Sequence, residues 1–181
     1  MKWLIASDLH GSALYTEQLI ARFDESGADR LLLLGDILYH GPRNALPEGY
    51  DPPRVAEMLN ACAERICCVR GNCDCEVDQM VLSFPLTADY LYLPVGKRMC
   101  FVTHGHVYTP DRLPALAAGD LFLFGHIHVP RCEERGSVTL LNPGSVSIPK
   151  GGSERSHMTL DGTRFEWHTL DGAVYRTLTV A

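Results

Sequence analysis

Two histidines separated by one residue, His126 and His128, follow a short apolar run that ends in glycine. Apolar runs of this length are typical of buried strands, and side chains at positions i and i+2 of an extended chain point the same way. Near the start of the chain, Asp8 and His10 follow another apolar run with the same spacing. Each pair could therefore reach into a metal site from the end of a strand.

Three further apolar runs lead into a residue of the same chemical kind: Asp36, Asn72 and His104. In an open α/β sheet, binding sites lie beyond the carboxyl ends of the strands, so we expect these side chains to converge there. Adjacent glycines would let the backbone turn sharply and approach the site. The complete set comprises two carboxylates, one amide oxygen and four imidazoles: Asp8, Asp36, Asn72, His10, His104, His126 and His128.

This mixture of ligands indicates a transition-metal site. Imidazole together with carboxylate suits Mn, Fe, Zn, Ni or Co, whereas Ca or Mg would be held by oxygen atoms. Seven ligands are too many for one tetrahedral ion and fit two ions that share a carboxylate. Two cations about 3.5–4 Å apart stabilise both sides of an in-line displacement at phosphorus, and they lower the pKa of a bridging water so that hydroxide can attack. The pattern therefore predicts a dinuclear phosphoester hydrolase.

The elements that position these residues alternate along the first two-thirds of the chain. Tyr15, Leu19 and Phe23 form one apolar helical stripe between the first two predicted strands. A strand, helix and strand in this order imply parallel strands with a right-handed crossover. Further helices are predicted over residues 53–62, 76–82 and 111–118, and buried strands over 3–6, 31–34, 66–69, 99–102 and 121–124.

The last third of the chain has a different pattern. Short β runs are predicted at 138–141, 157–160, 164–169 and 174–180, and Asp-Gly pairs separate the last three of them. Asp-Gly between such runs indicates antiparallel hairpins. We therefore expect an α/β fold of two packed mixed sheets with helices on the outer faces. The length of 181 residues fits a single domain, 1–181.

Composition narrows the class of protein. The formal net charge of −6 leaves no electrostatic footprint for duplex nucleic acid. The sequence shows neither a secretory signal pattern nor an apolar run approaching the roughly 20 residues that span a bilayer. Seven cysteines, two of them adjacent at 67–68 within an apolar run, are typical of reduced thiols and favour a cytoplasmic location.

In this order, the motifs Asp-x-His, Gly-Asp, Gly-Asn-x-Asp, His-Gly-His and Gly-His-x-His resemble the calcineurin-like metallophosphoesterase superfamily. The match runs from Asp8 to His128, and Asn-Pro-Gly-Ser at 142–145 extends it. The segment His-Gly-Pro-Arg-Asn at 40–44 also resembles the small bacterial YfcE-type phosphodiesterases. The resemblance implies a four-layer αββα sandwich and hydrolysis of a small phosphodiester substrate. It also implies manganese as the usual activating ion, although Zn, Ni, Fe or Co would suit the same ligands.

The family pattern implies a role for each ligand. Asp8, His10 and His128 would hold the first metal; Asn72, His104 and His126 would hold the second; and Asp36 would bridge both. Asp36, Asn72 and His104 are accordingly expected to be essential for catalysis.

Cys73 departs from the pattern of many members, which carry histidine between the asparagine and the acidic residue. A thiol is a poor substitute for an imidazolium as a proton donor, so Cys73 favours diesters or good leaving groups. Cys73, Arg43 and His106 are predicted to face the substrate, and the guanidinium fork of Arg43 would match phosphate oxygens. Alternatively, Arg43 and His106 are solvated surface residues. A role for Cys73 as the nucleophile is less favoured than attack by hydroxide.

Two other functions fit the same fold. One is a non-catalytic binding scaffold, as in a retromer subunit of this fold, for which degraded ligands would be expected. The other is a phosphomonoesterase or nucleotide pyrophosphatase on the same metals. We expect no membrane partner, and the terminal β runs could supply an interface for a homodimer or a higher homo-oligomer.

Overall fold

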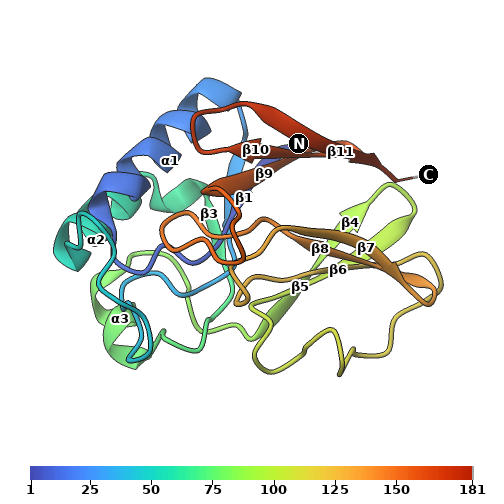
Figure 1. The fold of residues 1–181 in the computed structure, drawn as a ribbon, viewed down its shortest axis with the longest axis horizontal. Helices are drawn as coiled ribbons and strands as arrows, with labels where there is room; N and C mark the ends of the chain where they lie inside the picture. Colours follow the sequence, from blue (N-terminus) through green and yellow to red (C-terminus); the bar gives the residue numbers. More distant parts are fainter. Residues whose placement is uncertain (181) are drawn as a thin grey trace.

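The computed structural model describes residues 1–180 and arranges most of the chain in two mixed β-sheets with helices beside them (Figure 1). The larger sheet has the strand order β11-β10-β9-β1-β2-β3. The smaller sheet has the order β4-β5-β6-β8-β7. The predicted two-sheet α/β architecture is confirmed.

The six strands of the larger sheet are β1 (Lys2–Ala6), β2 (Arg30–Leu33), β3 (Ile66–Cys68), β9 (Ser156–Asp161), β10 (Arg164–Thr169) and β11 (Val174–Thr179). The five strands of the smaller sheet are β4 (Tyr90–Val95), β5 (Arg98–Thr103), β6 (Leu121–Leu123), β7 (Arg131–Arg135) and β8 (Val138–Asn142). Pairing is parallel within β1-β2-β3 and within β5-β6-β8, and antiparallel elsewhere. The parallel strands therefore end together, as the spacing of the ligand residues predicts.

Helix α1 (Ala13–Ser26) connects β1 to β2, and its ends follow ordinary capping chemistry. The side chain of Ser12 accepts a hydrogen bond from the backbone N–H of Tyr15, and Gly27 ends the helix in a left-handed conformation with φ 64°. Leu19 and Phe23 are fully buried against the outer face of the larger sheet. Burial of such side chains contributes roughly 1.5–3 kcal/mol each to stability.

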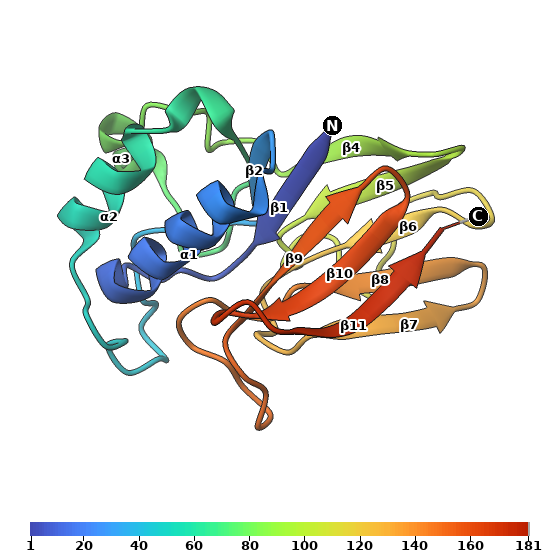
Figure 2. The same cartoon turned by 90° about the horizontal axis from the view of Figure 1, so that it is seen from above.

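Helices α2 (Pro52–Asn60) and α3 (Glu76–Val81) lie beside α1 at one end of the molecule (Figures 1 and 2). Asp51 caps α2 by accepting from the N–H of Arg54, and prolines occupy its first positions. The side chains of Val55 and Leu59 join the buried cluster beneath the helices. None of the helices within residues 1–180 is long and apolar enough to cross a bilayer.

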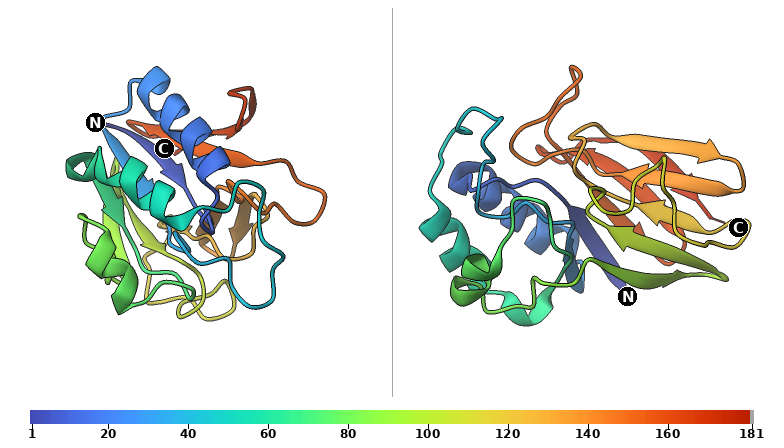
Figure 3. Two further views of the ribbon diagram at one scale, coloured as in Figure 1. Left: turned by 90° about the vertical axis from the view of Figure 1, so that its left-hand side faces the viewer. Right: turned by 90° about the horizontal axis from the view of Figure 1, so that it is seen from below.

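The predicted helix at 111–118 is wrong. This segment consists of turns and extended chain between β5 and β6, and it crosses the outer face of the smaller sheet. Pro110 and Pro114 explain the difference, since each lacks an N–H donor and disfavours a helix at the preceding residue. Leu113 and Leu116 instead pack onto buried aromatic rings of that face. The outer layer on this side is therefore a loop, and α1 and α2 cover the other sheet (Figure 3).

The core between the two sheets brings their parallel halves face to face. Ile5 and Leu32 from the larger sheet share one buried cluster with Val102 and Leu123 from the smaller sheet. Trp167 is completely buried in the same cluster, and its indole N–H donates to the backbone oxygen of Asn142 at 2.8 Å. This packing holds the carboxyl ends of β1 and β2 against those of β5 and β6.

His157 of β9 is buried on the other face of the larger sheet, beside Arg22 of α1. Its ring is 2% exposed and stacks on His168 of β10 with a centroid separation of 5.0 Å. Burial, reinforced by the charges of His168 and Arg22, lowers the pKa of His157 to about 3.

We expect the neutral His157 ring to make folding pH-dependent. The unfolded chain takes up a proton below about pH 6.5, whereas the folded chain does not until about pH 3. The free energy of unfolding should therefore fall with pH below 6.5, with a contribution of at most about 1.4 kcal/mol per pH unit from this group. Urea unfolding at pH 7.5 and 5 should show a smaller loss for His157→Gln than for the wild type. Equal losses in the two proteins would contradict the prediction.

Candidate metal centre

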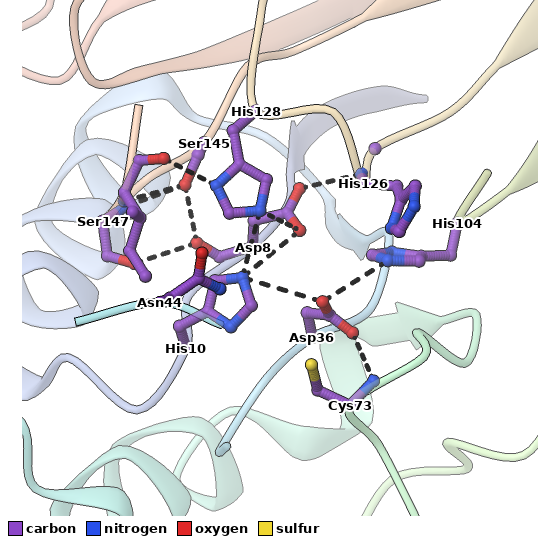
Figure 4. A network of polar contacts seen from close by, with 12 residues as sticks. Asp8, His10, Asp36, Asn44, Cys73, His104, His126, His128, Ser145 and Ser147 are labelled. Atoms are coloured by element: carbon purple, nitrogen blue, oxygen red, sulfur yellow. Dashed lines mark hydrogen bonds and ion pairs between the residues drawn. The ribbon is translucent and has the colours of Figure 1, made fainter. Parts of the chain in front are cut away.

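The ends of β1, β2, β5 and β6 meet at one buried cluster of carboxylates and imidazoles (Figure 4). On one side of the cluster, Asp8 lies beside two histidines. Its Oδ1 is 3.3 Å from Nε2 of His128 and 3.6 Å from Nε2 of His10. One ligand atom from each of these three residues lies within 4.8 Å of the others. They form a compact group that could hold one cation.

Asp36 stands between this group and the next. Its Oδ2 lies 3.6 Å from Nε2 of His10 and 3.5 Å from Nε2 of His104. The carboxylate thus faces imidazoles from both sheets at similar distances. This is the placement required of a bridging ligand.

The second group contains the remaining predicted ligands. Nε2 of His104 lies 3.1 Å from Oδ1 of Asn72. The ring of His126 lies edge-on to that of His104, with centroids 5.1 Å apart, and its backbone N–H donates to Oδ2 of Asp8 at 3.1 Å. The structure thus brings all seven predicted residues together, and their individual roles as ligands remain predictions.

Hydrogen bonds to the backbone fix the orientation of three imidazoles. The Nδ1 atoms of His10, His104 and His128 lie 2.8, 2.7 and 2.6 Å from the carbonyl oxygens of Tyr39, Leu34 and Ile148. A carbonyl oxygen only accepts, so Nδ1 carries the proton and Nε2 points into the cluster. Metal-binding histidines are typically oriented by such bonds.

Two features of the cluster call for a cation. Nε2 of His10 lies 3.2 Å from Nε2 of His128, so two lone pairs would face each other unless a proton or a metal lies near them. Oδ1 of Asp8 is buried and accepts no hydrogen bond within the described chain. A buried charged oxygen without a partner is costly, and a bound metal ion would compensate both groups. The residues present therefore fit divalent metal ions.

The electrostatics of the cluster depend on the same contacts. Burial opposes ionisation of Asp8 and Asp36, but the imidazoles beside them outweigh it and hold the pKa of both carboxyls below its usual value. Burial likewise acts to lower the pKa of His104, and the Asp36 carboxylate reverses this and raises it to about 9. Burial and the neighbouring His104 lower the pKa of His126 to about 4.

The backbone at these positions is strained. Among residues 1–180, the non-glycine residues with positive φ are all predicted ligands: Asp8, His10, Asp36, His126 and His128. Left-handed conformations of this kind are uncommon outside glycine, asparagine and aspartate and persist where the surrounding structure enforces them. Here the N–H of His10 donates to the oxygen of Asp36 at 2.9 Å, which joins the two strand-end turns. The strain therefore directs the ligand side chains toward one point.

Asp74 has a supporting role that the sequence analysis did not assign. Its carboxylate is buried and accepts from the N–H groups of Asp36, Ile37 and Gly71 at 2.8, 2.8 and 2.6 Å. These bonds hold the turn that carries Asp36 against the turn that carries Asn72. The acidic residue that closes the Gly-Asn-x-Asp motif was the available signal.

The loop after β8 supports the other carboxylate. The hydroxyls of Ser145 and Ser147 donate to the backbone oxygen of Asp8 at 2.9 and 3.0 Å. The Asn142 side chain donates to the oxygen of Gly125 at 2.8 Å. The Asn-Pro-Gly-Ser motif therefore positions two of the ligand turns.

A cavity of about 500 Å³ opens above the cluster. Of the residues predicted to face the substrate, Arg43 and Cys73 line this cavity, and His106 lines a neighbouring hollow of about 390 Å³. His126 borders both spaces. A ligand on the cluster could therefore extend in two directions.

A family model for the calcineurin-like phosphoesterase superfamily domain matches residues 1–164. The chain belongs to this superfamily. It is 53% identical over 161 residues to "Phosphodiesterase YfcE" of Escherichia coli strain K12, which covers 89% of this chain and 88% of that protein. It is also 30% identical over 162 residues to "Probable metallophosphoesterase YsnB" of Bacillus subtilis strain 168, which covers 83% of this chain and 78% of that protein.

One solved structure agrees with this assignment, and a second shares the fold. The structure of Yfce, a phosphoesterase from E. coli, superposes with a TM-score of 0.96 at 48% identity and covers all of both chains. Vacuolar Protein Sorting 29 from Cryptosporidium parvum superposes with a TM-score of 0.62 at 18% identity, over 98% of this chain and 97% of that one. The second likeness shows the shared fold alone.

Gly71 offers a test of how tightly the carboxylate is held. A Cβ atom at this position would lie 2.1 Å from Oδ1 of Asp36. We expect Gly71→Ala to displace Asp36 and to lower metal-dependent activity about 100-fold, as small displacements in active sites do. Gly136→Ala is the matched control for an added methyl group, since its Cβ would meet nothing within 4 Å, although the left-handed φ there costs some stability. Metal content and activity should be measured on protein whose far-UV spectrum is native. Unchanged values for Gly71→Ala would contradict the close contact.

Metal binding should release protons. With a pKa of about 9, His104 carries a proton at pH 7, and a cation must displace it. Mn²⁺ titrated calorimetrically at pH 7, in two buffers of different ionisation enthalpy, should show release of about one proton or more per chain. His168→Gln, remote from the cluster, should leave this release unchanged. Heats that do not depend on the buffer would rule out a protonated His104.

Proposed function

We propose that this protein is a metal-dependent phosphodiesterase that hydrolyses small phosphodiesters with two Mn²⁺ ions per chain. The observation that carries this proposal is the placement of Asp36 between His10 and His104, with Nε2 of each ring aimed at its carboxylate. A ligand shared in this way suits a pair of cations. The similarity to a curated phosphodiesterase over most of the chain supports the same activity.

The proposed ligand sets follow the two groups of side chains: Asp8, His10 and His128 for one ion, Asn72, His104 and His126 for the other, with Asp36 shared. When bound, such ions supply positive charge for phosphate oxygens and lower the pKa of a coordinated water. The protein contributes the orientation of the imidazoles, through their bonds to backbone carbonyls. It also contributes the exclusion of water around the buried carboxylates.

Cys73 supports diesters with good leaving groups as substrates. Burial, together with the charge of Asp36, raises the pKa of the Cys73 thiol. A thiol is a poorer proton donor than an imidazolium, so Cys73 is proposed to be neither the nucleophile nor an efficient proton donor. A leaving group that departs with little protonation is then favoured. Arg43 and His106 are proposed to contact other parts of the substrate.

Removal of the shared carboxylate charge tests the function directly. Asp36→Asn should lower the hydrolysis of bis(4-nitrophenyl) phosphate in Mn²⁺ by about 1000-fold or more, because both ions lose a charged ligand. Asp161→Asn, an exposed change at the end of β9, is the matched control and should keep wild-type activity. Hydrolysis by the wild type that is independent of added metal after chelation would contradict the proposal.

Replacement of the Cys73 thiol tests whether diester hydrolysis needs it as a nucleophile or as a proton donor. Cys73→Ala should retain diester hydrolysis within about fivefold, because the side chain is proposed to be neither nucleophile nor main proton donor. Steady-state rates on bis(4-nitrophenyl) phosphate and on 4-nitrophenyl phosphate should be compared in one preparation. Complete loss of diester hydrolysis in Cys73→Ala would show that the thiol is required.

Metal analysis separates the enzyme from a binding scaffold of the same fold. The complete ligand set favours the enzyme, and we expect close to two ions per chain after manganese loading.

We further propose a cytoplasmic location, since all seven cysteines are free in the structure. Strand β11, which exposes Val174 and Tyr175 at the sheet edge, remains the proposed surface for self-association.

A further inference from the structure

Two positively charged side chains lie at the rim of the cavity above the metal centre. Arg43 and Lys150 line the cavity from two different loops, and both side chains are exposed. Within residues 1–180, no carboxylate forms an ion pair with either of them. The carboxylate that lines the cavity, Asp36, lies at its floor and is 2% exposed. The rim is therefore cationic, although the chain as a whole is acidic.

Both cations belong to loops that are tied to the metal centre. In the first loop, the backbone oxygen of Tyr39 accepts from Nδ1 of His10 at 2.8 Å, and the Asn44 side chain donates to the oxygen of His40 at 2.8 Å. In the second loop, the N–H of Lys150 donates to the oxygen of His128 at 3.0 Å. The backbones that carry the two cations are thus fixed relative to the predicted ligands.

The ligand cluster is buried, whereas Arg43 and Lys150 are exposed, so the two would contact different parts of a substrate. The scissile phosphate must reach the buried ligand cluster, where metal ions would offset its single negative charge. The exposed guanidinium of Arg43 and ammonium of Lys150 would contact the substituent of the scissile phosphate that points toward solvent. A phosphate monoester, with close to two negative charges at pH 7, matches two unpaired cations, and arginine binds it through a bidentate fork.

We propose that the substrate is a phosphodiester with a second, terminal phosphate on one of its substituents, and that Arg43 and Lys150 bind this second phosphate. The inference rests on the proposed phosphodiesterase function and specifies its substrate class. The reaction is unchanged: water adds to the diester phosphorus, one P–O bond breaks, and the leaving alcohol keeps the oxygen and takes up a proton. The rim contacts act on binding and not on the bond that breaks.

The test compares two chromogenic esters that differ only in the second phosphate. These are thymidine 5′-(4-nitrophenyl phosphate) and the same compound with a 3′-phosphate. The wild type in Mn²⁺ should show a kcat/KM about tenfold higher for the 3′-phosphorylated ester, as expected for two exposed ion pairs. This ratio should fall toward one in about 0.5 M salt, because the rim charges are screened.

Variants then assign the preference to the two side chains. Arg43→Gln and Lys150→Gln should each lower the ratio about threefold, and the double variant should bring it close to one. Lys97→Gln, an exposed lysine in the turn between β4 and β5, is the matched control and should keep the wild-type ratio.

Three outcomes would overturn the inference. Equal kcat/KM for the two esters in the wild type would show that the enzyme does not recognise a second phosphate. An equal loss on both esters in the double variant would show that the rim cations bind the scissile phosphate. Hydrolysis of neither ester would overturn the proposed function, and this inference with it.

Discussion

The structure depends on the compensation of charge at one buried point. Asp8 and Asp36 bring two carboxylates to the ends of β1 and β2, and the Nε2 atoms of the neighbouring imidazoles face them. Such a cluster is unfavourable unless cations lie within it. The strained turns, the carbonyl bonds to Nδ1 and the buried Asp74 all stabilise this arrangement. The buried cluster is thus electrostatically unfavourable by itself, and bound metal ions would stabilise it.

Both sheets are required to build this site, because neither carries the full set of predicted ligands. The larger sheet carries both carboxylates together with His10 and Asn72, and the smaller sheet carries His104 and the His126–His128 pair. The apolar cluster between the sheets fixes their separation, so a small core change could alter distances at the site. The bond from Nδ1 of His104 to the oxygen of Leu34 crosses between the sheets and records this alignment directly.

The sequence predicted the convergence of ligands because short apolar runs followed by polar residues specify strand ends, and parallel strands bring those ends together. It did not predict the loop at 111–118, because its apolar spacing is compatible with a helix and the two prolines only weaken that assignment. The role of Asp74 was also missed, since its three bonds join turns that are distant in sequence. Strain at Asp8 and His10 likewise has no signal in residue type alone. Tertiary contacts account for the role of Asp74 and for the strained turns, whereas the prolines of the 111–118 segment act locally.

The bonds from Ser145 and Ser147 to Asp8 span more than 130 residues of sequence, as |i−j| values of 137 and 139 record. During translation Asp8 emerges long before the segment that holds its backbone oxygen. Contacts of such separation form late, because the entropy of closing the intervening chain is lost first. The segment 145–147 must therefore be synthesised before the turn at Asp8 can be held in this way.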